Sequence, residues 1–244
     1  MPAPAPDTAP ARRLLLLRHG ETTYNATRRM QGQMDTTLSD LGIAQARAVA
    51  THFGQVERGI RRIIASDLSR ARETALAVGR ELGLDVAVDP RLRETNLGAW
   101  QGMTHGEIDE AEPGMRWRWR NDPTWAPEGA ETRIEVAARM RSVVDELMET
   151  DDDWPGSTTL LVAHGGAIAA LTGALLEVPQ PMLTMFNGLR NTAWVELEAR
   201  TRPDGALGWY LGAFNARLTG ENPAPAPAPD DGPAALAGPE GAGT

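Results

Sequence analysis

Two of the four histidines in this 244-residue chain follow short apolar runs. His19 comes just after Leu14–Leu17, and His164 comes directly after Thr158–Ala163. A neutral imidazole nitrogen is a competent nucleophile toward phosphorus, and the product is a phosphohistidine. A glycine follows each histidine, which lets the backbone approach a phosphate group and offer N–H donors. These positions therefore point to phosphoryl transfer.

Two arginines occur at the same kind of position. Arg18 ends the first apolar run, and Arg70 comes shortly after another, Arg62–Ala65. Guanidinium groups match phosphate oxygens with paired N–H donors and keep their charge near neutral pH. Two such charges beside His19 would lower its pKa and keep the imidazole unprotonated, because like charge disfavours the imidazolium form.

Glu94 and His164 would complete this chemistry. Glu94 comes shortly after a brief apolar segment, Val86–Val88. A carboxylic acid at that point could donate the proton that a leaving alkoxide needs. His164 could donate a hydrogen bond to the oxygens that carry charge in the transition state.

Each of these residues, taken alone, could have a structural role and no part in catalysis. A lone histidine after a strand is more often a core or loop residue than a nucleophile. Arg70 could lie on an exposed helix surface beside Glu73, and Glu94 could be a solvated loop carboxylate. For His19, the combined motif Arg18–Thr22 instead favours the nucleophile over a core or loop residue.

Strand and helix patterns alternate along the chain, which is typical of an α/β protein. Apolar runs predict strands at residues 13–17, 62–65, 86–88, 158–163, 192–197 and 207–214. Apolar spacings of three and four predict helices at residues 39–53, with Ser39 as N-cap, 68–82, ended by Gly83, 131–148 and 167–176. We therefore expect a three-layer α/β/α sandwich with a mainly parallel central sheet, whose ligands bind beyond the carboxyl ends of the strands.

Composition limits the other classes of function. The formal net charge is -9, and all 24 basic residues are arginine. An acidic chain disfavours nucleic acid as a partner, and no apolar run approaches the roughly 20 residues that span a membrane. The absence of cysteine excludes disulfides and thiolate metal sites. Met1–Pro10 carries no secretory signal pattern, so the expected location is cytoplasmic.

One domain is expected over residues 12–220. Tails rich in alanine, proline and glycine flank it at residues 1–11 and 221–244. These tails are expected to be disordered, because they cannot bury enough apolar area to offset the entropy of ordering.

Two further clusters receive structural interpretations. The acidic run Asp151–Asp153 is interpreted as a solvated loop rather than a metal site. Three tryptophans that alternate with arginines are interpreted as a lid or an interface patch: Trp117, Trp119 and Trp125.

Five motifs occur in order along the chain: Arg18–Asn25 continued by Arg29–Gly32, Ala65–Ala71, Leu92–Glu94, Pro127–Glu131 and Leu161–Gly166. In this order they resemble the histidine phosphatase superfamily, whose fold is shared with cofactor-dependent phosphoglycerate mutases. The resemblance extends from about Arg13 to about Phe214. It departs at Thr37, where proline is usual, and at Gln101, where glutamate is common.

The resemblance implies a phosphorylated nucleophile, His19, and a proton donor, Glu94. Three residues would line the phosphate site: Arg18, Arg70 and His164. Four more would contact the substrate: Asn25, Arg29, Gln31 and Gly165. No cofactor and no metal are implied, the partner is a small anionic phosphorylated substrate, and relatives suggest a homodimer.

Within the superfamily, three segments resemble glucosyl-3-phosphoglycerate phosphatases: Leu92–His105, Asp122–Pro127 and Asn191–Trp194. This implies a phosphomonoester hydrolase for a phosphoglycerate or sugar-phosphate type substrate such as glucosyl-3-phosphoglycerate. One alternative is a 2,3-bisphosphoglycerate-dependent phosphoglycerate mutase, although mutases of the superfamily carry a longer insert after the proton-donor glutamate than Thr95–Gly98. The other alternative is a non-catalytic phospho-ligand binding module, which would have no need of a proton donor.

Overall fold

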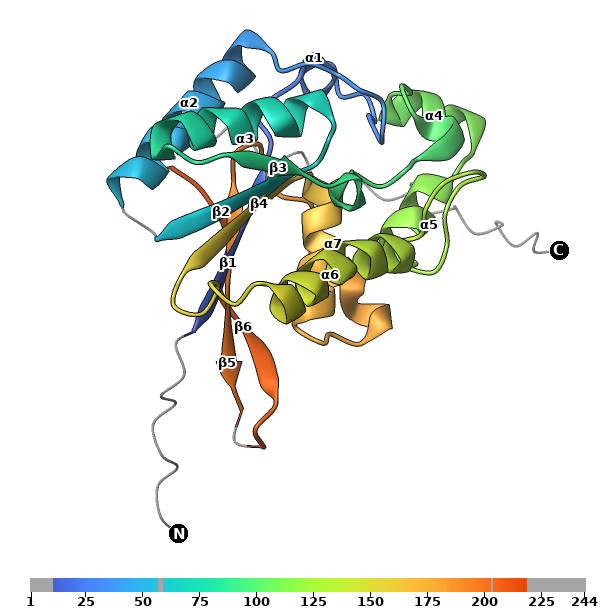
Figure 1. Cartoon of the computed structure of the whole chain (residues 1–244). Helices are drawn as coiled ribbons and strands as arrows, with labels where there is room; N and C mark the ends of the chain where they lie inside the picture. The colour runs from blue at the N-terminus through green and yellow to red at the C-terminus, as the bar shows by residue number, and fades with distance from the viewer. Residues whose placement is uncertain (1–10, 57–58, 203, 219–244) are drawn as a thin grey trace, which may run out of the picture.

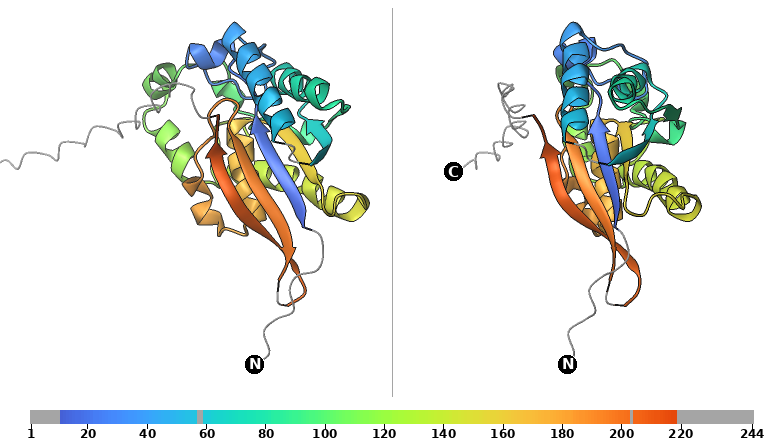
Figure 2. Two further views of the ribbon diagram at one scale, coloured as in Figure 1. Left: turned by 90° about the vertical axis from the view of Figure 1, so that its left-hand side faces the viewer. Right: turned by 60° about the vertical axis from the view of Figure 1, so that its left-hand side comes forward.

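A single mixed sheet forms the centre of the computed structural model, which describes residues 11–56, 59–202 and 204–218. Its six strands in these ranges follow the order β3-β2-β4-β1-β5-β6. Their bounds are β1 (Arg12–Arg18), β2 (Ile60–Ala65), β3 (Val86–Val88), β4 (Thr158–Ala163), β5 (Trp194–Thr201) and β6 (Leu207–Ala216). Strands β3, β2, β4 and β1 are parallel, whereas β5 and β6 form an antiparallel hairpin at one edge (Figure 2). The predicted mainly parallel sheet is confirmed.

Helices cover both faces of this sheet (Figure 1). The α-helices are α1 (Thr23–Ala26), α2 (Asp40–Gln55), α3 (Ser69–Leu82), α4 (His105–Ala111), α5 (Met115–Asn121), α6 (Arg133–Thr150) and α7 (Gly165–Leu175). Short 3-10 segments occur at Pro90–Leu92, Gly98–Trp100 and Gln180–Met185. Helices α2 and α3 pack on one face, and α6 and α7 pack on the other. The predicted three-layer α/β/α sandwich is therefore confirmed.

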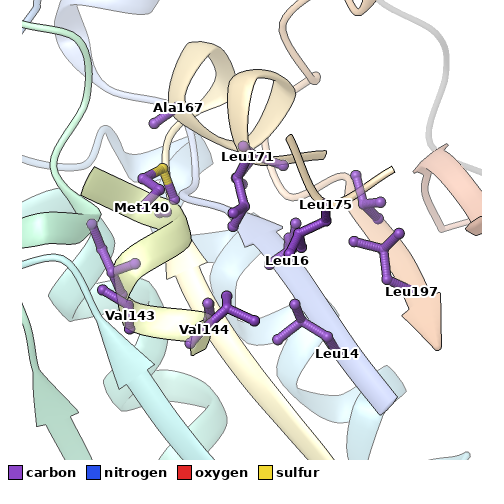
Figure 3. Packing of buried hydrophobic residues seen from close by; sticks show 14 of the residues in the cluster. Leu14, Leu16, Met140, Val143, Val144, Ala167, Leu171, Leu175 and Leu197 are labelled. Carbon is purple, nitrogen blue, oxygen red and sulfur yellow. The ribbon is translucent and has the colours of Figure 1, made fainter. Parts of the chain in front are cut away.

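The leucine run of β1 explains how the two hydrophobic cores are separated. Side chains alternate along a strand, so Leu14 and Leu16 join the core under α6 and α7, whereas Leu15 and Leu17 join the core under α2 and α3. Figure 3 shows the first of these cores, where Met140 of α6 packs with the β1 leucines. Burying each leucine side chain contributes about 1.5–3 kcal/mol to folding.

Local signals predicted two helix ends correctly. The Ser39 side chain accepts a hydrogen bond from the backbone N–H of Gly42, which caps α2. Gly83 ends α3 with a left-handed backbone, at φ 66°. The short helices α4 and α5 were not predicted, because neither is long enough to show a helical apolar period.

Two structural interpretations from the sequence need correction. Asp151 is not solvated, since it is buried and its carboxylate lies 2.9 Å from Nε of Arg62. Trp119 and Trp125, which were interpreted with Trp117 as a lid or an interface patch, are partly buried. Their rings pack against the buried Trp100, at centroid distances of 6.1 and 6.0 Å. Both rings therefore belong to a small core beside the sandwich.

The predicted tails lie outside the described residues, apart from Ala11. Within the described ranges, no helix combines the length and the apolar character that a membrane crossing requires.

The loop after β1 packs closely on the start of α2. A Cβ atom at Gly42 would lie 1.9 Å from the backbone oxygen of Glu21, and backbone atoms cannot move aside cheaply. We expect Gly42→Ala to lower the free energy of unfolding by about 1–3 kcal/mol through overpacking. Urea denaturation measures this change.

Gly106→Ala is the matched control. Gly106 lies in α4, and nothing lies within 4 Å of an added Cβ. This change should raise stability by about 0.4–1 kcal/mol, because alanine restricts the unfolded chain. A Gly42→Ala protein as stable as the parent would contradict the packing described here.

Candidate active site

The pairing of β1 with β4 brings two histidines together. Arg18 lies opposite Ala163 in this parallel ladder, so the next residues of both strands are neighbours. The backbone N–H of His19 donates to the oxygen of Ala163 at 3.1 Å. The rings of His19 and His164 lie 5.1 Å apart between centroids, with an angle of 60° between their planes. The structure thus joins the two predicted strand-end histidines.

The tautomer of His19 follows from one hydrogen bond. Its Nδ1 lies 2.6 Å from the backbone oxygen of Gly20, which can only accept, so Nδ1 carries the proton. This leaves the lone pair on Nε2. Burial lowers the pKa of His19 well below its ordinary value, and the charges of Arg18 and Arg70 lower it further. The imidazole is therefore neutral and nucleophilic at Nε2.

Backbone carbonyls hold both predicted arginines. The Arg18 guanidinium donates to the oxygen of Leu189. Arg70 is 1% exposed and donates to the oxygens of Met34 at 2.7 Å and Gly32 at 2.8 Å. Burial lowers the pKa of Arg70 to about 10, while the charge of Glu94 opposes this change. Arg70 thus stays charged at neutral pH and is not the exposed helix residue of the alternative interpretation.

Several buried nitrogen atoms around the histidines have no hydrogen-bond partner among the described residues. They are Nε of Arg18, Nε of Arg70, and both ring nitrogens of His164. Burial lowers the pKa of His164 well below its ordinary value, with the charge of Arg70 as the next cause. Buried polar atoms are normally hydrogen-bonded, so these nitrogens form a set suited to a bound anion.

Glu94 is held at the start of α7. Its carboxylate accepts hydrogen bonds from the backbone N–H groups of Thr95 at 2.8 Å, Gly166 at 3.1 Å and Ala167 at 2.9 Å. A Cβ atom at Gly166 would lie 2.9 Å from Oε1 of Glu94, so only glycine fits there without displacing the carboxylate. The amides of Gly166 and Ala167 therefore position the predicted proton donor.

The ion pair between Arg139 and Glu131 lies beside the backbone of Glu94 and holds it. Arg139 donates to the backbone oxygens of Arg91, Arg93 and Glu94, at 2.7–2.9 Å. It also forms an ion pair with Glu131 at 2.7 Å. Sequence reasoning did not single out Arg139. Its position eight residues after the end of the Pro127–Glu131 motif, on the helix that follows, was the available signal.

The four predicted substrate contacts differ in their surroundings. Asn25 completes the capping box of α1 with Thr22, and its Oδ1 accepts from Nδ2 of Asn191 at 3.2 Å. Arg29 is partly exposed and donates to the oxygen of Gly102 at 2.8 Å. The remaining two are a buried Gln31, which accepts from the Thr36 hydroxyl at 2.6 Å, and Gly165, the first residue of α7.

A second arginine near the site was also not predicted. Arg133 begins α6, and burial lowers its pKa while the charge of Glu94 opposes this change. A single arginine in the first turn of a predicted helix has no sequence signal that separates it from a surface residue. In the described ranges, no three histidine, aspartate or glutamate side chains gather as metal ligands.

The chain matches the family model of the histidine phosphatase superfamily (branch 1) over residues 14–209. This match covers most of the 244 residues. The chain belongs to the histidine phosphatase superfamily. The resemblance drawn from the five motifs, and the prediction of a phosphatase of this superfamily, are confirmed.

Similar proteins narrow the position within the histidine phosphatases. A glucosyl-3-phosphoglycerate phosphatase from Mycolicibacterium vanbaalenii is 49% identical over 215 residues, which are 84% of this chain and 95% of that protein. The structure of a mycobacterial glucosyl-3-phosphoglycerate phosphatase in complex with VO3 superposes with a TM-score of 0.79 at 48% identity, covering 84% and 100% of the two chains. A probable phosphoglycerate mutase from Yersinia pestis is 37% identical over 80% of this chain and 89% of its own.

The neutral buried histidines make stability depend on pH. Below about pH 6.5, histidines of the unfolded chain take up protons that His19 and His164 do not take up in the folded protein. Stability therefore falls as the pH falls, by up to about 1.4 kcal/mol per pH unit for each histidine. We expect His164→Gln to reduce the slope of the unfolding free energy against pH by up to about 1.4 kcal/mol per pH unit between pH 6 and 5. Urea denaturation across this range measures it.

The same experiment contains its control. Between pH 7.5 and 8.5 both histidines are neutral in the folded and unfolded states, so the slopes of the two proteins should coincide. An unchanged slope between pH 6 and 5 would contradict the neutral state of His164.

Proposed function

We propose that this protein hydrolyses a phosphomonoester through a phosphohistidine on His19. One observation carries the proposal: a buried, neutral imidazole with its free lone pair on Nε2 lies among the unpartnered nitrogens of Arg18, Arg70 and His164. The arrangement offers a nucleophile and a set of anion donors in one place. The proposed substrate is glucosyl-3-phosphoglycerate or a closely related phosphoglycerate ester, supported by relatives that carry this name.

The first step transfers the phosphoryl group to the protein. The Nε2 lone pair of His19 attacks phosphorus, the bond from phosphorus to the ester oxygen breaks, and Glu94 gives its proton to that oxygen. The guanidinium groups of Arg18 and Arg70 offset the charge on the phosphoryl oxygens. A hydrogen bond from His164 adds to this stabilisation.

The second step releases the phosphate. Glu94, now ionised, takes a proton from a water molecule while the water oxygen attacks phosphorus. The bond between phosphorus and Nε2 breaks, which restores neutral His19 and yields inorganic phosphate. Glu94 thus acts as acid and then as base, and each step leaves it ready for the next. This use of a proton donor also separates the proposal from a non-catalytic binding module.

The predictions about the substrate and its contacts also belong to this proposal. The substrate is small, anionic and phosphorylated. Asn25, Arg29, Gln31 and Gly165 are proposed as its further contacts. A homodimer, a cytoplasmic location and the absence of a nucleic-acid partner stay predictions.

Replacing Glu94, which acts first as acid and then as base, separates phosphorylation of His19 from hydrolysis of the phosphohistidine. With p-nitrophenyl phosphate, the leaving group departs as a stable anion, so Glu94→Gln should still form phosphohistidine. Hydrolysis of that intermediate should slow by about 10²–10⁴-fold, the usual size of a general acid–base effect. We expect a burst of one nitrophenol per active site, followed by slow turnover, in a rapid-mixing measurement.

His19→Ala serves as the control, since it should show neither the burst nor acid-labile phosphate on the protein. Undiminished steady turnover in His19→Ala would overturn the proposed function.

Product analysis decides between hydrolysis and the mutase alternative. We expect incubation with 3-phosphoglycerate and 2,3-bisphosphoglycerate to release inorganic phosphate and to form little 2-phosphoglycerate. Phosphorus NMR of the mixture distinguishes all four species. Conversion to 2-phosphoglycerate that outpaces phosphate release would instead identify a mutase.

A further inference from the structure

Arg133 is the arginine of α6 whose charge has no carboxylate bonded to it. Its Nη1 donates to the backbone oxygen of Phe186 at 3.3 Å, and the described residues offer it no ion pair or other hydrogen bond. The other two arginines of this helix differ. Arg139 pairs with Glu131 and Arg141 pairs with Asp145, at 2.7 and 2.8 Å. Arg133 therefore keeps most of its N–H donors available.

The segment from Phe186 to Leu189 links Arg133 to the phosphate-binding residues. Arg133 donates to the oxygen at one end of this segment, and Arg18 donates to the oxygen at the other end. Three residues of chain span at most about 11 Å. A Cβ atom at Gly188 would lie 3.6 Å from the backbone carbon of Gly165, so the segment passes the start of α7. Arg18 borders the start of that helix, and Arg133 is bonded to the same short segment of chain.

Glu94 also ties Arg133 to the site. Its charge acts on Arg133 as it does on Arg18 and Arg70, and it opposes the effect of burial on the pKa of all three. Arg133 hence lies within electrostatic range of the proposed proton donor.

The three arginines around Glu94 carry more positive charge than one phosphate dianion balances. A phosphomonoester carries about −1.5 to −2 charges near pH 7. When Glu94 is protonated to act as the acid, the three arginines bring three positive charges to the site. A dianionic phosphate balances two of them. One carboxylate on the same substrate would balance the third, and a guanidinium binds a carboxylate through two parallel hydrogen bonds.

We propose that Arg133 binds the carboxylate of a phosphoglycerate-type substrate and thereby selects such esters over phosphomonoesters that lack a carboxylate. This inference rests on the proposed hydrolysis of a phosphoglycerate ester. Arg133 contacts substrate but no bond that breaks, so it determines specificity without taking part in proton transfer. Its loss should therefore raise KM more than it lowers kcat.

A pair of substrates tests the inference. One is glucosyl-3-phosphoglycerate, and the other is its analogue in which a hydroxymethyl group replaces the carboxylate. For Arg133→Gln, kcat/KM on the carboxylate ester should fall about 10- to 100-fold, the range that hydrogen bonds to a charged group imply. On the analogue it should change by less than about threefold, since no carboxylate is lost. Arg133→Lys should recover part of the loss.

Arg141→Gln is the matched control. Arg141 lies on the same helix and also donates to a backbone oxygen, that of Ala174 at 3.0 Å, but it is paired with Asp145. This variant should keep the parent's preference for the carboxylate ester. Thermal unfolding of each variant checks that the fold is intact.

The outcomes separate the two proposals. Equal losses on both substrates for Arg133→Gln would show a role in phosphoryl binding or in the fold and would overturn the inference, as would unchanged kinetics on both. Failure of the parent protein to release phosphate from either ester would overturn the proposed function itself, and the inference with it.

Discussion

The register between β1 and β4 is the constraint on which the site depends. A shift of one residue in a parallel ladder turns every side chain to the opposite face of the sheet, and it would separate His19 from His164. The leucine run of β1 does not itself prevent this shift, because leucine suits both faces. Contacts at the start of β1 prevent the shift. The indole N–H of Trp154 donates to the oxygen of Arg13 at 2.9 Å, and the N–H of Arg13 donates to Ser157.

Burial controls the electrostatics of this site more than charge does. The flanking arginines predict a low pKa for His19, but burial is the larger cause and the charges of the arginines come second. The same burial lowers the pKa of Arg70 without neutralising it. Backbone oxygens of Met34 and Gly32 compensate part of the lost hydration. The same burial thus keeps the imidazole neutral, whereas Arg70 stays charged because its lowered pKa, about 10, is still well above neutral pH.

The sequence predicted the sheet and the strand-end residues well because both rest on short-range patterns. Apolar runs mark buried strands, and Ser39 and Gly83 end helices through their own backbone chemistry. It did not predict α4 and α5, because neither is long enough to show a helical apolar period. It also did not predict that Trp119 is partly buried, because this depends on contact with Trp100, which no local period encodes. Arg133 was missed for the same reason. Its importance lies in a bond to Phe186, 53 residues away along the chain.

The attachment of Glu94 to α7 has a mechanical consequence. His164 immediately precedes this helix, and the N–H groups of Gly166 and Ala167 bind the Glu94 carboxylate. The start of the helix, the second histidine and the carboxylate are therefore linked by direct bonds. A tilt of α7 against the sheet would move the group that handles protons together with His164, so the spacing between these two would change little.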